Sequence, residues 1–247
     1  MWYIQISFNG SDPCTNAVQI VSSDFVRVTM SNYAMIDLEM CRIPRVLQPD
    51  HIELHNEIIQ IGAVLIDNSY HISDRFSTYV CPQFGTIDDF IEKLTGIGAN
   101  DVKDAPSIQE ALHLFLSWLP DDTTIISWSE TDKQQIESEL NCKALHIPAL
   151  SPLFDTWLDC QAMFSEKMQA DTKVYRLSEA LRIADINFDE NEHDGFADAY
   201  NTALLFIKMN TDKDFKLSKY YTSEDTKETS TTSLGALFAK LNLSDLE

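Results

Sequence analysis

The sequence predicts an α/β protein with a mixed β-sheet flanked by helices, an extra N-terminal β segment and a C-terminal tail. Three β-rich runs come first, at residues 33–40, 57–67 and 74–80, and turn residues separate them in meander order. Helical patterns then surround a further β-branched run at 123–128. A meander followed by helix–strand–helix order is typical of a mixed sheet with helical layers.

The chain length of 247 residues is enough for one α/β domain of ordinary size with appendages. Loosely alternating apolar residues predict an N-terminal β extension at 1–32. The alternating helices and strands place the main domain at 33–209, and a polar, Lys-, Asp- and Thr-rich composition indicates a linker and tail at 210–247.

The composition limits the classes of function. A formal net charge of −21 excludes a generic nucleic-acid coat protein, because phosphate binding rests on Lys and Arg unless cations intervene. The five cysteines are scattered and form no C-x-x-C pair, which favours a reducing compartment. No signal peptide and no membrane-spanning run is evident, so we expect a cytoplasmic protein with no membrane partner.

Helical periodicity places the helices that follow the meander. The best-marked helix spans 107–119, where Ser107 and Glu110 form a capping box. A shorter helix within 87–98 stops at Thr95 and Gly96. Further helices are expected from residue 129 to about 140, around 154–164, at 177–184 with Ser178 as its cap, and at 196–209.

Two acidic residues interrupt the apolar strand at 33–40. Asp37 and Glu39 lie two positions apart, so their side chains point to the same face, opposite Leu38. Neighbouring acids on a core strand are costly unless a cation compensates their charge. The pair therefore indicates either a metal site or an edge strand with one solvated face.

Three more residues stand near the ends of predicted elements. Asp132 opens the helix after strand 123–128, and Asp198 lies in the helix at 196–209, five residues after His193. Functional groups gather at strand ends in open α/β sheets. Each residue also has a structural explanation: an acid favoured by the helix dipole, a solvated helix face, or a surface histidine.

The order of these residues resembles the DEDDh branch of the DnaQ-like 3′–5′ exonucleases, whose fold is RNase H-like. The first motif of that family, Asp-x-Glu, is matched by Asp37 and Glu39. The third motif, His-x-x-x-x-Asp, is matched by His193 and Asp198. The resemblance covers residues 33–209 and is greatest for the stand-alone Eri-type and KapD-like group.

Two further segments carry the resemblance. Asp132 matches the second motif, an Asp that opens a helix after a strand, with Glu130 as the alternative. Residues 94–97 read Leu-Thr-Gly-Ile and are similar to the segment that precedes the long helix in this family. The ordered motifs together make the resemblance specific.

The resemblance implies a metal-dependent hydrolase with two divalent cations, Mg²⁺ or Mn²⁺, which activate water and stabilise the leaving oxygen. Asp37 would bridge both ions. Glu39 and Asp198 would hold the ion that carries the nucleophile, whereas Asp132 would act on the second ion. His193 would be the general base, because an unperturbed pKa of about 6.5 suits proton transfer near neutral pH.

The implied substrate is the 3′ end of single-stranded RNA or DNA, from which nucleoside 5′-monophosphates would be released. By resemblance, Leu94, Thr95 and Ile97 would wedge against the terminal base, and the backbone near Met40 would meet the 3′-hydroxyl. Trp128 would either stack on a base or lie in the core.

The C-terminal segment supports a second hypothesis. Leucines and a phenylalanine recur through residues 234–243 behind the polar linker. This segment is either a helix that docks on its own domain or a docking site for a protein partner. Together with the adverse charge, it suggests the alternative of a regulatory or protein-binding module that acts through this segment.

Overall fold

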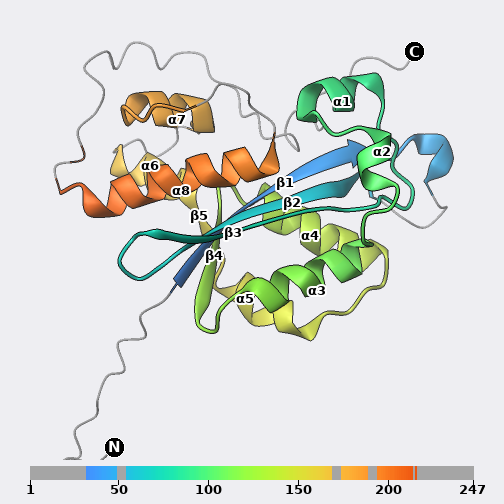
Figure 1. The fold of residues 1–247 in the computed structure, drawn as a ribbon, viewed down its shortest axis with the longest axis horizontal. Helices are drawn as coiled ribbons and strands as arrows, with labels where there is room; N and C mark the ends of the chain where they lie inside the picture. The colour runs from blue at the N-terminus through green and yellow to red at the C-terminus, as the bar shows by residue number, and fades with distance from the viewer. Residues whose placement is uncertain (1–31, 49–53, 169–173, 189–193, 214, 216–247) are drawn as a thin grey trace, which may run out of the picture.

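The computed structural model describes residues 32–48, 54–168, 174–188, 194–213 and 215. Nearly all of the predicted N-terminal extension, His193 and the C-terminal segment at 234–243 lie outside the described residues. The described residues form one mixed five-stranded sheet with helices on both faces, as the sequence predicts (Figure 1). No helix in this part of the chain is long and apolar enough to cross a lipid bilayer.

The acid-bearing strand, β1, is the central strand of the sheet, whose order is β3-β2-β1-β4-β5. The predicted meander is confirmed, because β1, β2 and β3 are antiparallel neighbours, whereas β4 and β5 join in parallel. The alternative of an edge strand is therefore wrong for β1. The strands are β1 (Asn32–Arg42), β2 (Asn56–Ile66), β3 (Ile72–Tyr79), β4 (Thr123–Ser127) and β5 (Leu158–Asp159).

Two apolar clusters bury the faces of the sheet. Ile36 and Leu38 lie in the cluster formed with α3 and α4, and Met35 lies in the cluster on the opposite side, where α8 packs on β1 and β2 (Figure 1). This alternation places the side chains of Asp37 and Glu39 on the α8 side. The helices of these layers are α3 (Ile108–Trp118), α4 (Thr131–Cys142), α6 (Cys160–Lys167), α7 (Leu177–Ile183) and α8 (Gly195–Thr211).

The helix signals between the meander and β4 are confirmed. The Ser107–Glu110 capping box opens α3, with the Ser107 amide donating to Glu110 Oε2 at 2.9 Å. Gly96 ends the first helix in the left-handed region at φ 72°, a conformation that suits glycine. The short elements of this part are the 3₁₀ turn η1 (Arg45–Leu47), α1 (Asp89–Thr95) and α2 (Ala99–Val102).

Two predicted features after β4 are wrong. The helix expected at 154–164 is interrupted, because β5 lies between α5 (Ser151–Asp155) and α6 and pairs with β4. The 3₁₀ turn η2 (Pro148–Leu150) precedes α5. Asp159 then restarts the helix by accepting the N–H of Ala162. Apolar spacing could not reveal this break, because a two-residue strand has no periodicity of its own. Similarly, Ser178 is not the cap of α7, which begins one residue earlier.

A buried charge cluster ties β2 to α4 and to the loop before α1. The Lys143 ammonium lies 2.5 Å from Glu57 and 2.7 Å from Glu139, and all three side chains are nearly or fully buried. Glu57 also accepts the backbone N–H groups of Gln83, Phe84 and Gly85. Because the buried charges are paired and hydrogen-bonded, the cluster fixes this loop at the end of β1.

The start of α8 lies against the backbone of β2 at Gly62. A Cβ added to Gly62 would meet the carbonyl carbon of Gly195 and the amide nitrogen of Phe196 at 2.3 Å. Real Cβ atoms do not approach backbone this closely, so any other residue at this position would push α8 away. Gly62 pairs with Asp37 across the sheet, so its lack of a side chain allows α8 to lie beside the acids.

We expect Gly62→Ala to destabilise the fold, because the added methyl group displaces backbone rather than a flexible side chain. Overpacking of this kind costs about 1–3 kcal/mol of unfolding free energy. Gly98→Ala is the matched control, since its Cβ would meet side-chain ends rather than backbone, at 3.2 Å from Glu92 Oε1 and 3.4 Å from Asp101 Oδ2. Urea denaturation of both variants tests this, and equal unfolding free energies would contradict it.

Candidate active site

Three carboxylates converge on the α8 side of the sheet. Oxygen atoms of Asp37, Glu39 and Asp198 all lie within 4.8 Å of one another. Asp37 and Glu39 project from the central strand, and Asp198 comes from the first turn of α8, next to the contact at Gly62. Residues far apart in the sequence thus form one acidic cluster.

Asp132 joins the cluster because β4 is short. β4 pairs with β1 only as far as Ile36, which lies opposite Ser127. Beyond that point the first turn of α4 follows, and the Asp132 carboxylate accepts the backbone N–H of Leu38. Asp132 is 7% exposed, whereas the alternative residue, Glu130, is exposed and its charge acts on Asp159. The structure therefore brings Asp132, rather than Glu130, to Asp37.

Burial and mutual repulsion raise the pKa values of these acids. For Asp37 the largest cause is desolvation, followed by the charges of Asp132 and Asp198, and its pKa lies well above the usual value. The pKa of Glu39 is raised well above its usual value by desolvation and then by the same two charges. Desolvation raises the pKa of Asp132 to about 7, although hydrogen bonds from backbone amides oppose the shift. Without a cation, the cluster retains protons near neutral pH.

The donor set fits a divalent cation. Glu39 is 1% exposed, and its Oε2 atom has no hydrogen-bond partner among the described residues. A buried carboxylate oxygen without a partner is costly, and a cation at the centre of the cluster would remove that cost. Hard oxygen ligands of this kind suit Mg²⁺ or Mn²⁺.

The sequence interpretation missed the residues that hold the start of α8. Gln60 of β2 donates from Nε2 to Asp194 Oδ1 at 3.2 Å and accepts the N–H of Gly195 at 3.1 Å. Asp194 is the N-cap of α8 and also accepts the N–H of Phe196. The available signal was a polar residue inside the apolar run from Ile58 to Ile66.

Most of the predicted substrate contacts lie at the carboxyl end of β1. Met40 and Ile97 are both buried in the cluster on the α3 side, and Leu94 is half-buried at the end of α1. Thr95 is 7% exposed, and its hydroxyl donates to the Ile91 carbonyl at 2.9 Å and accepts the N–H of Ile97. The Thr95 hydroxyl is therefore engaged within the segment that would contact the substrate.

Trp128 lies in the core between the sheet and α6. Its indole is 7% exposed and packs at 6.3 Å from the Phe164 ring. This position favours the core alternative over base stacking. His193 lies outside the described residues and directly precedes Asp194 in the chain, so its predicted role as general base remains a prediction.

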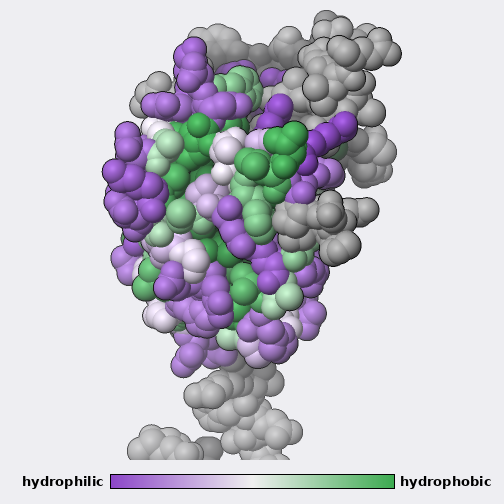
Figure 2. All heavy atoms as spheres, turned by 90° about the vertical axis from the view of Figure 1, so that its right-hand side faces the viewer, coloured by the Kyte–Doolittle hydropathy of each residue, from purple (hydrophilic) through white to green (hydrophobic). Residues whose placement is uncertain are grey.

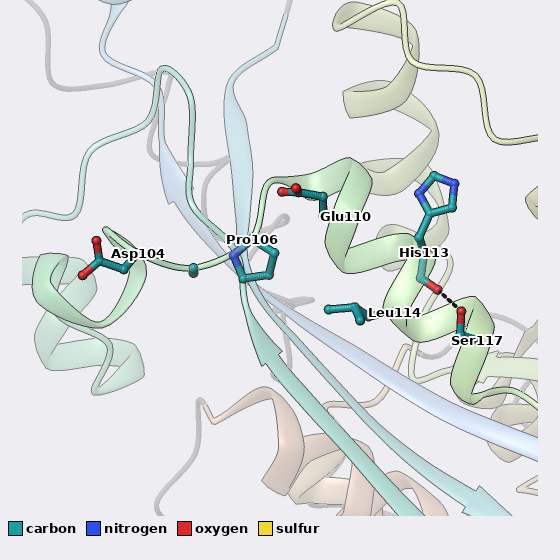
Figure 3. Close-up of a pocket in the computed structure, with 7 residues that line it drawn as sticks. Asp104, Pro106, Glu110, His113, Leu114 and Ser117 are labelled. Carbon is teal, nitrogen blue, oxygen red and sulfur yellow. Dashed lines mark hydrogen bonds between the residues drawn. The ribbon is translucent and has the colours of Figure 1, made fainter.

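A groove of about 740 Å³ lies elsewhere, along α3 (Figure 3). Asp104, Pro106, Glu110 and His113 line it, and the Ser117 hydroxyl donates to the His113 carbonyl at 2.7 Å. None of the clustered carboxylates contributes to this groove. Because α3 packs on the opposite face of the sheet from α8, the groove is separate from the acidic site.

Comparisons with known proteins agree with this architecture. The family model described as Exonuclease matches residues 35–206, which is more than half of the chain. The nuclease domain of 3′hExo, a DEDDh family member bound to rAMP, has a similar fold, with a TM-score of 0.63 and 21% identity over 76% of this chain and 96% of that one.

Two curated relatives cover the same region. The PolC-type DNA polymerase III of Caldanaerobacter subterraneus subsp. tengcongensis is 35% identical over 156 residues, which is 63% of this chain and 10% of that protein. Human ERI1 exoribonuclease 2 is 31% identical over 178 residues, 62% of this chain and 25% of that protein. The chain thus spans a quarter or less of these relatives. Because the matched model covers more than half of the chain, this chain belongs to the exonuclease family.

Proposed function

We propose that the protein is a metal-dependent 3′–5′ exonuclease that hydrolyses phosphodiester bonds at the 3′ ends of single-stranded RNA or DNA. The observation that carries the proposal is the convergence of Asp37, Glu39 and Asp198, with Asp132 beside them, at the centre of a family-typical fold. The released products would be nucleoside 5′-monophosphates.

Each residue of the site has a distinct task. Asp37, Glu39 and Asp198 offer the oxygens that would hold divalent cations, and Asp132 adds a fourth carboxylate from α4. Two bound cations would activate water and stabilise the leaving oxygen of the phosphodiester. His193 would accept the proton of the attacking water, since a histidine titrates near neutral pH.

The surface beside the site suits an unpaired nucleic-acid end. Figure 2 faces the end of the molecule where α1 and η1 lie, and apolar side chains gather there among hydrophilic ones. Phe90 of α1 and Val46 and Leu47 of η1 are exposed, and the Arg42 guanidinium lies 6.0 Å from the Phe90 ring centroid. Apolar and cationic groups together can contact bases and phosphates, which supports an unpaired substrate.

The choice between RNA and DNA rests on contacts to the 2′-hydroxyl. The names of the relatives include both an exoribonuclease and DNA polymerases, so we propose that both polymers be compared directly. Matched RNA and DNA oligonucleotides of the same sequence, digested side by side, identify the preferred sugar from the ratio of kcat/KM values.

We expect Asp37→Asn to abolish digestion of a 5′-labelled single-stranded oligonucleotide in Mg²⁺ or Mn²⁺, because a neutral amide cannot replace the carboxylate at a cation site. The expected loss in kcat/KM is about a hundredfold or more. Asp121→Asn, at an exposed carboxylate before β4, is the control. Full activity in Asp37→Asn, or digestion that persists in a chelator, would refute the proposal.

The site also predicts a pH-dependent stabilisation by divalent cations. The pKa values of Asp37, Glu39 and Asp132 are raised in the folded, metal-free protein, which therefore holds protons that the unfolded chain has lost. Its free energy of unfolding consequently falls as pH rises from about 4. Cations compete with those protons and bind better at higher pH.

We therefore expect Mn²⁺ to raise the melting temperature more at about pH 8 than at about pH 6. A tenfold weaker affinity at the lower pH removes about 1.4 kcal/mol of stabilisation. Differential scanning fluorimetry measures the shift, with Glu39→Gln as the variant in which it should shrink at both pH values. A shift that is independent of pH, or unchanged in Glu39→Gln, would argue against a cation in this cluster.

A further inference from the structure

We infer that Gln60 is a positioning residue for Asp198, an inference that rests on the exonuclease activity proposed above. Gln60 lies in β2 directly opposite Glu39 in the strand pairing, and its side chain is 5% exposed. Its hydrogen bonds go to the cap and first amide of α8 and to Ser77 of β3, not to the clustered carboxylates. It would therefore act on the site through the helix.

The Gln60 amide uses both its donor and its acceptor ends. Nε2 donates to Asp194 Oδ1 at 3.2 Å and to Ser77 Oγ at 3.4 Å, while Oε1 accepts the N–H of Gly195 at 3.1 Å. Only an amide offers a donor and an acceptor in this fork without a charge. A leucine of similar size makes none of these bonds and leaves the Gly195 N–H without its partner.

The bonds to Asp194 lead directly to Asp198. The Asp194 carboxylate caps α8 by accepting the N–H of Phe196 at 3.1 Å, and the Asp194 carbonyl accepts the N–H of Asp198 at 3.0 Å. Gln60 therefore holds Asp194, the residue whose carbonyl accepts the first backbone hydrogen bond of α8, from the N–H of Asp198. Displacement of that residue shifts the carboxylate that must meet Asp37.

Close packing makes this fastening sensitive to small movements. A Cβ on Gly195 would meet Gln60 Oε1 at 3.2 Å and the Asp37 carbonyl oxygen at 3.3 Å, so the first turn of α8 touches both neighbouring strands. Gly62, two residues beyond Gln60 on the same face, allows that contact. Cation and catalytic constellations tolerate only about 0.5 Å of displacement.

The first arm of the test measures catalysis. We expect Gln60→Leu to lower kcat on a single-stranded oligonucleotide by about tenfold or more with KM within about twofold, because a small misplacement affects the chemical step. Ser107→Ala is the matched control, since it removes a hydrogen-bonded helix cap from α3 and should lower the melting temperature without lowering kcat.

A reciprocal exchange separates positioning from general stability. In the double variant Gln60→Glu with Asp194→Asn, the introduced amide can donate to the introduced carboxylate, which still accepts the N–H of Gly195. We expect its kcat to lie within about threefold of Asp194→Asn alone, because the bond is restored in the reverse direction. Gln60→Leu combined with Asp194→Asn should stay as slow as Gln60→Leu.

An arm independent of activity is amide hydrogen exchange of the peptide that covers residues 194–199. Gln60→Leu should speed exchange there by about tenfold, whereas Ser107→Ala should not. Two results would overturn the inference. One is unchanged exchange together with a kcat within about twofold of the wild type in Gln60→Leu, and the other is a reciprocal double variant as slow as Gln60→Leu. If the wild-type protein does not digest the oligonucleotide, the proposed function is refuted but this inference is not, because the exchange experiment would still decide the role of Gln60.

Discussion

The structure depends on holding four carboxylates together against their own repulsion. Asp37 and Glu39 are fixed by the central strand, but Asp132 and Asp198 arrive on helices that the repulsion would drive away. The surrounding packing opposes that force. Gly62 lets α8 approach β2 closely and the hydrogen bonds of Gln60 hold its start there, while the buried Lys143 cluster anchors α4 to β2.

Much of the fold was accessible from sequence because the relevant forces are local. The alternation around Asp37 and Glu39 placed both side chains on one face, and the Ser107 capping box located the start of α3. The predictions that were wrong concerned features that depend on residues far away in the sequence. The break between α5 and α6 exists because β5 pairs with β4, and no pattern within residues 151–167 contains that information.

The candidate site shows the same division. The clustered acids could be named from their order and spacing, whereas their supports could not, because the hydrogen bonds of Gln60 cross 134 and 135 positions of sequence to Asp194 and Gly195. For Trp128 the sequence left base stacking and core packing open, and the contact with Phe164, which is distant in the sequence, favours the core. Sequence spacing identifies reactive groups more readily than the residues that orient them.

The short length of β4 has a consequence for how this fold can vary in length. The acidic site lies where β4 ends opposite Ile36. Because β4 does not continue past that point, the backbone N–H of Leu38 bonds to Asp132 instead of to a further residue of β4. Extra residues after Ser127 would extend the ladder and move Asp132 along the chain, whereas extra residues in the exposed turn at Asp121 would leave the ladder intact. Insertions and deletions should therefore accumulate before β4 and be eliminated after it.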